Sequence, residues 1–110
     1  SFFFSFSYCL PVRWAQSSTV LPKLKTLNLY RNLIKDEGAI VFARENRLSQ
    51  LEEIDLAQNE IGDEGLLALA VSKAFPNLAA VCLDNNFASV EAKEEAQACP
   101  NFRKLQSINL

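Results

Sequence analysis

The stretch that decides the fold is residues 24–34, which read LKTLNLYRNLI. The chain repeats this line with changes as LEEIDLAQNEI at residues 51–61 and as LAAVCLDNNFA at residues 78–88, always 27 residues further on, and residues 105–110, LQSINL, begin a fourth copy. A fixed period between 20 and 50 residues is typical of repeat architectures, in which each unit packs against its neighbours. The sequence therefore predicts a solenoid built from units of about 27 residues.

Each copy of the line predicts one short β-strand followed by a turn. Apolar residues alternate around a single free position, as in Leu27-Asn28-Leu29, and this period of two is that of a strand with one buried face. An asparagine follows three positions after the last strand leucine in every full copy. A buried amide both donates and accepts hydrogen bonds, so we expect these residues to form a ladder from turn to turn, although any single one of them could be an ordinary turn residue. The predicted structural asparagine ladder is Asn32, Asn59 and Asn86.

The segments after the asparagines, residues 35–48 and 62–75, predict helices. Asp36 and Asp63 precede apolar-rich stretches, and aspartate suits the N-cap of a helix, where N–H groups lack partners. We expect two glycines to let the helices approach closely and four residues to face the core. These residues are Gly38 and Gly65, then Phe42, Ala43, Leu69 and Ala70.

Composition excludes several classes of function. The chain has 110 residues and a net charge of −2, whereas nucleic-acid binding requires a basic surface. Histidine, the usual general base, is absent, so we predict no enzyme, no catalytic residue, no metal and no cofactor. Cys9, Cys82 and Cys99 are odd in number and lack metal-ligand spacing, which favours a reducing, cytoplasmic location. The apolar run near residue 1 is too short to cross a bilayer, and no membrane partner is predicted.

The lines LKTLNLYRNLIKDEG and LEEIDLAQNEIGDEG resemble the leucine-rich repeat superfamily, and the helix in each unit resembles its ribonuclease-inhibitor-like subgroup. The resemblance covers residues 21–110. It implies an α/β fold, a leucine-rich-repeat solenoid in the shape of a horseshoe, with a parallel β-sheet on the concave face and helices on the convex face. It also implies binding to another protein. The third copy departs from the pattern, with Ala88 in place of isoleucine and Ala92 in place of glycine, and we expect it to be the least stable unit.

The positions free to vary on the concave face are the predicted partner-binding residues. They lie beside the strand leucines and form a neutral-to-acidic surface, with one aromatic side chain as a candidate anchor and one cysteine interpreted as a small, unreactive side chain. The set is Thr26, Asn28, Tyr30, Glu53, Asp55, Ala57, Ala80, Cys82, Asp84, Ser107 and Asn109.

Residues 1–20 break the repeat, which divides the chain into a non-repeat segment and a repeat domain over residues 21–110. Phe, Ser, Tyr, Cys, Leu and Pro have pyrimidine-rich codons, so we hypothesise that residues 1–12 are a translated intron end, the alternative being a disordered tail. Neither end of the chain looks like a natural terminus, and we expect a fragment of a larger protein.

Three functions fit the resemblance. A protein–protein interaction scaffold is favoured, because no nucleophile–base pair, metal cluster or phosphate loop is recognisable. The alternatives are part of a Ran-type GTPase-activating protein or the sensor end of a NOD-like receptor, for which no specific residue can be assigned, because fold alone does not determine function.

Overall fold

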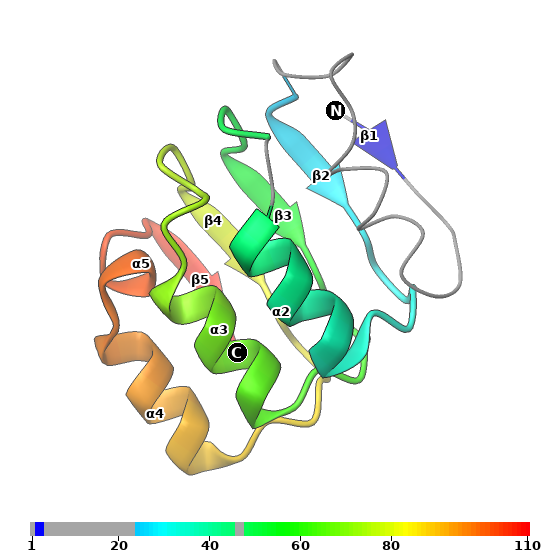
Figure 1. Cartoon of the computed structure of the whole chain (residues 1–110), viewed down its shortest axis with the longest axis vertical. Helices are drawn as coiled ribbons and strands as arrows, with labels where there is room; N and C mark the ends of the chain where they lie inside the picture. Colours follow the sequence, from blue (N-terminus) through cyan, green and yellow to red (C-terminus); the bar gives the residue numbers. More distant parts are fainter. Residues whose placement is uncertain (1, 4–23, 46–47) are drawn as a thin grey trace.

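A computed structural model describes residues 2–3, 24–45 and 48–110 (Figure 1). Within these residues, five strands form one parallel sheet in sequential order, so each strand pairs with the next strand along the chain. The strands are β1 Phe2–Phe3, β2 Thr26–Asn28, β3 Glu53–Asp55, β4 Ala80–Cys82 and β5 Ser107–Asn109. The helices are α2 Lys35–Glu45, α3 Asp63–Val71, α4 Val90–Ala98 and α5 Pro100–Arg103.

The architecture has two layers, with the helices covering one face of the sheet (Figure 1). Helix α2 packs on α3 and α3 packs on α4, in the order of the strands beneath them. The predicted α/β class with a parallel sheet is confirmed, and it fits a repeat solenoid. The horseshoe curvature stays a prediction, as does the boundary at residue 20, since residues 4–20 lie outside the described residues.

The strand register shows that the 27-residue period is a structural unit. Leu27 pairs with Ile54, Ile54 with Val81, and Val81 with Ile108. Just after the strands, Leu29 N–H donates to Asp55 O at 2.8 Å and Leu56 N–H donates to Cys82 O at 2.8 Å. Each repeat therefore makes the same backbone bonds to the next repeat.

The core lies between the sheet and the helices, and each repeat contributes its middle strand residue, apolar residues on either side of the strand and part of its helix. Leu27, Ile54 and Val81 are at most 5% exposed. The four helix positions predicted to face the core, Phe42, Ala43, Leu69 and Ala70, are all buried, which confirms that prediction. The ring centroids of Phe42 and Phe75 lie 5.3 Å apart, which is within the range of favourable aromatic pairs.

The three asparagines after the strands join successive turns. Asn59 Oδ1 accepts hydrogen bonds from Asn32 N–H at 2.8 Å and from Ile34 N–H at 3.3 Å, and Asn59 Nδ2 donates to Leu29 O at 2.8 Å. Asn86 makes the same set one repeat later, accepting from Asn59 N–H at 2.9 Å and Ile61 N–H at 3.0 Å. These side chains satisfy backbone groups that turn away from the sheet, which lets the turns stay buried.

The predicted N-caps were wrong in one respect, because each aspartate binds at the start of the helix of the following repeat. Asp36 lies inside α2, and its Oδ1 accepts from Gly62 N–H at 2.7 Å and Gly65 N–H at 2.9 Å at the start of α3. Asp63 likewise accepts from Ser89 N–H at 2.7 Å, and Ser89 caps α4. The carboxylate still meets the positive end of a helix, but that helix is a neighbour.

Candidate functional site

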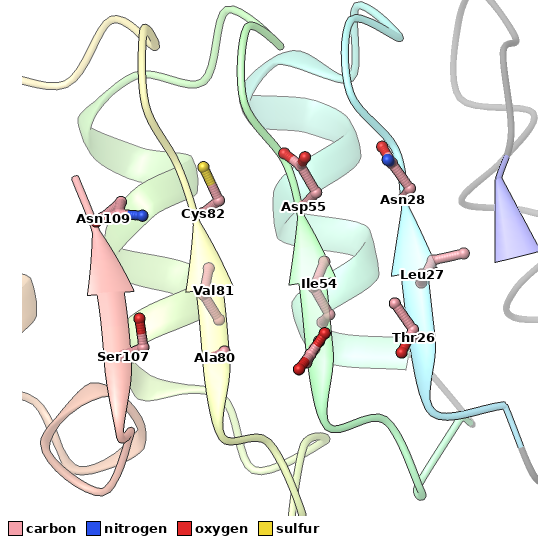
Figure 2. A pocket seen from close by; sticks show the side chains of 11 residues that line it. Thr26, Leu27, Asn28, Ile54, Asp55, Ala80, Val81, Cys82, Ser107 and Asn109 are labelled. Atoms are coloured by element: carbon pink, nitrogen blue, oxygen red, sulfur yellow. The ribbon is translucent and has the colours of Figure 1, made fainter. Parts of the chain in front are cut away.

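The face of the sheet turned away from the helices, here called the open sheet face, carries two rows of side chains. The strand register places Asn28, Asp55, Cys82 and Asn109 side by side, and it places Thr26, Glu53, Ala80 and Ser107 in a second row. Figure 2 shows the first row crossing β2 to β5 at one level. The residues between them in each strand point into the core, because successive side chains of a strand lie on opposite faces of the sheet. Residues on the open sheet face can therefore contact a partner, while their neighbours in the strand are structural.

The two rows line a shallow hollow of about 310 Å³. The eight lining side chains that belong to the predicted partner-binding set are Thr26, Asn28, Glu53, Asp55, Ala80, Cys82, Ser107 and Asn109. The other three predicted residues follow the strands and do not line the hollow. Tyr30 is half-buried and Asp84 is exposed. Ala57 is only 6% exposed, because the chain turns toward the helices there, so it offers little surface to a partner.

Negative charge is concentrated in the second repeat. Glu53 is exposed and Asp55 is half-buried on the same strand. Among the described residues the one ion pair joins Lys25 Nζ to Glu52 Oε2 at 3.9 Å, so no basic side chain in that part of the chain neutralises these two carboxylates. The open sheet face is therefore suited to a neutral or basic partner surface.

Asp55 also has a structural role that its neighbour Asn28 shares. Asp55 Oδ1 accepts from Ala57 N–H at 3.0 Å, and Asn28 Oδ1 accepts from Tyr30 N–H at 3.0 Å. Both are turns in which the side chain binds the backbone two residues on. Asparagine can thus replace aspartate at this position without loss of the turn, which gives a way to remove the charge alone.

Cys82 lies in the row beside Asp55, and its environment favours the neutral thiol. Burial raises the pKa of Cys82; a backbone hydrogen bond at Asp84 opposes the rise, while the charges of Asp55 and Asp84 add to it. A thiol needs a lowered pKa to be a strong nucleophile at neutral pH. This arrangement supports a packing role for Cys82.

We expect alkylation of Cys82 by iodoacetamide to reach half its limiting rate at a higher pH in the folded chain than in the chain unfolded by urea. In the unfolded chain a cysteine thiol has a pKa of about 8.5. Because the folded pKa is raised, the contribution of Cys82 to stability is present below the unfolded pKa and is lost as the pH rises through the folded value. Mass spectrometry of the Cys82 peptide measures both profiles. An equal or lower midpoint in the folded chain would contradict the assignment.

Two kinds of site are not found in the described ranges 24–45 and 48–110. No group of three or more His, Cys, Asp or Glu side chains there is placed to hold a metal ion. No helix there is both long and apolar enough to cross a membrane.

Comparison with known proteins finds a match for two of the repeats. A family model described as Leucine Rich repeat matches residues 20–43 and 48–70. These two segments are leucine-rich repeats. Leucine-rich repeats are generally protein-interaction modules and are generally non-enzymatic. No curated protein and no solved structure matches the chain. The third repeat, in which Ala88 and Ala92 depart from the pattern, lies outside the matched segments.

Sequence reasoning missed one further surface, formed by the residues between the ladder asparagines and the next core residue. Leu33 is 45% exposed and Phe87 is 68% exposed, although each follows an asparagine of the ladder directly. The signal was in the sequence, since a large apolar side chain occupies this position in two of the three repeats.

Proposed function

We propose that the open sheet face binds another protein, and that this chain serves as an interaction scaffold. The observation that carries the proposal is the pair of side-chain rows that meet in one hollow while every alternate strand residue is committed to the core. A surface that can vary without disturbing the core is suited to recognition. The helix in each repeat supports the ribonuclease-inhibitor-like subgroup, and the odd number of cysteines supports a cytoplasmic location.

Charge at the centre of the face defines the partner surface that it fits. The carboxylates of Glu53 and Asp55 favour a partner that presents basic or hydrogen-bond-donating groups there. The neutral neighbours Thr26, Asn28, Ser107 and Asn109 supply hydroxyl and amide groups at the sides. Such an arrangement gives specificity through hydrogen bonds and makes the association sensitive to salt.

The double variant Glu53→Arg, Asp55→Asn is expected to weaken partner binding at least about ten-fold, because charge reversal at an interface opposes basic groups on the partner. Asparagine keeps the acceptor for Ala57 N–H, so the fold should stay intact. The partner is isolated on the immobilised chain, purified, and titrated by calorimetry at two salt concentrations.

Glu91→Arg is the matched control, since Glu91 is an exposed carboxylate on α4 in the helical layer. The affinity of the Glu91→Arg variant for the partner should remain within about two-fold of the affinity of the unaltered chain. Equal losses for the two variants would indicate non-specific attraction between charges, and an unchanged affinity of the double variant would move the binding site off the open sheet face.

A further inference from the structure

A second surface lies where the turns leave the sheet, and we call it the rim groove. It is a hollow of about 520 Å³, lined by two residues from each of three repeats. The lining residues are Arg31, Leu33, Gln58, Glu60, Asn85 and Phe87. None of them lines the hollow of the open sheet face. The rim groove therefore goes beyond the proposed function and can be tested separately.

Repetition of the backbone aligns these side chains into rows. Arg31, Gln58 and Asn85 occupy the same repeat position, with φ of 57°, 55° and 59°. At the second position, Leu33 and Glu60 have φ of 52° and 58°. The ladder asparagines and core residues on either side point inward, which leaves the groove residues facing out. The turn geometry explains why the groove residues are exposed, and their side-chain chemistry indicates what kind of partner would bind there.

The groove gathers apolar surface at its two ends. The large apolar side chains that are exposed in the described part of the chain are Leu33, Val71, Phe87 and Val90, and two of these four line the groove. Leu33 comes from the first repeat and Phe87 from the third. Exposed apolar side chains gathered in a hollow mark a contact site more often than single scattered ones do, and aromatic anchors are enriched at such contacts.

A carboxylate lies between the two apolar ends. Glu60 is half-buried, comes from the middle repeat, and forms no ion pair within the described residues. Leu33, Glu60 and Phe87 occupy one repeat position, so the row reads apolar, acidic, apolar. The complementary row on a partner is apolar, basic, apolar.

The spacing of the row selects the form of that partner. Neighbouring strands of a sheet lie about 4.8 Å apart, so successive repeats present one groove residue about every 4.8 Å. An α-helix presents one side chain per turn along one face, about every 5.4 Å. We propose that the rim groove binds a helix of a partner protein that carries apolar, basic and apolar side chains at positions i, i+4 and i+7.

The test uses a phage library of helical peptides about 15 residues long, randomised at those three positions and selected on the whole chain. The expected clones carry leucine, isoleucine, methionine or phenylalanine at the two outer positions and lysine or arginine at the middle one. Selection on the Glu60→Lys variant should enrich aspartate or glutamate at the middle position. A reversal of charge preference would place the middle side chain against residue 60.

Synthetic peptides from the selection are then titrated against variants by fluorescence anisotropy. Phe87→Ser should weaken binding at least about ten-fold, and Val71→Ser, at the far end of α3, should leave it within about two-fold. Glu53→Arg should also have no effect, because Glu53 lies on the open sheet face. Circular dichroism checks that each variant folds.

Three results would overturn the proposal. The library could enrich no pattern, the selected peptides could bind Phe87→Ser and Glu60→Lys unchanged, or Glu53→Arg could abolish binding. The last result would place the peptides on the open sheet face, so the rim groove would fail while the proposed function stood. Loss of partner binding in the Glu53→Arg, Asp55→Asn variant tests the open sheet face alone.

Discussion

Replacing Asn59 with alanine is expected to lower the free energy of unfolding by about 3–5 kcal/mol. The Asn59 side chain is fully buried and accepts from the N–H groups of Asn32 and Ile34. Each buried donor left without a partner costs about 1–3 kcal/mol. The carbonyl of Leu29 loses its donor as well, and the carbonyl of Ala57 keeps only the hydrogen bond from Arg31 N–H. The free energy of unfolding of a small domain is about 5–15 kcal/mol in total, so the variant should be close to unfolding.

Two further asparagines serve as controls for this prediction. Asn86 makes equivalent hydrogen bonds but is only half-buried, so water can replace part of them, and Asn86→Ala should cost about 1–2 kcal/mol. Asn77 is exposed and donates once, to Ser49 O at 3.1 Å, so Asn77→Ala should cost less than about 1 kcal/mol. Urea unfolding followed by circular dichroism measures all three. The ladder account fails if Asn59→Ala costs no more than Asn77→Ala.

Gly65→Ala should destabilise the chain by about 2 kcal/mol, although alanine is the better helix former by about 1 kcal/mol. A β-carbon at Gly65 would lie 2.6 Å from Asp36 Oδ1, 2.8 Å from Ile61 Cγ2 and 3.0 Å from Ala39 Cβ. Overpacking of this kind costs about 1–3 kcal/mol. It would also push away the carboxylate that caps α3, which is worth about 1 kcal/mol more.

The sign of the stability change in Gly65→Ala shows whether overpacking or helix propensity dominates. Gly62→Ala is the matched control. At Gly62 the three atoms nearest to an added β-carbon all belong to Asp36, and the nearest, Oδ2, is 3.0 Å away, so the carboxylate needs to shift less. Gly62→Ala should lower the free energy of unfolding by less than about 1 kcal/mol, and thermal unfolding compares the two variants. Stabilisation by Gly65→Ala would show that propensity dominates and that α2 and α3 are not in close contact there. The double variant Asp36→Ala, Gly65→Ala should cost less than the sum, because one clash is removed.

The period of the sequence accounts for most of the fold that could be predicted. Alternation around Leu27 and Ile54 located the strands, and the apolar residues at Phe42 and Leu69 located the buried side of the helices. These features are local or repeat with the chain, so a single sequence contains them.

The features that sequence reasoning missed depend on contacts between repeats. Asp36 was assigned to its own helix, because spacing along the chain does not show that its carboxylate reaches Gly62 and Gly65. Ala57 was placed with the contact residues, since alternation does not reveal where the backbone leaves the sheet. The exposure of Phe87 follows from a turn geometry that includes a positive φ at Asn85, a residue type that tolerates it.

Site-directed photo-cross-linking tests whether the open sheet face contacts a partner protein. A photoreactive phenylalanine analogue is placed at Ser107 on the open sheet face and at Glu94 on the exposed side of α4. We expect a cross-link to a discrete protein from Ser107 and none from Glu94. Cross-links from Glu94 without any from Ser107 would contradict this expectation, because the partner would then bind the helical layer.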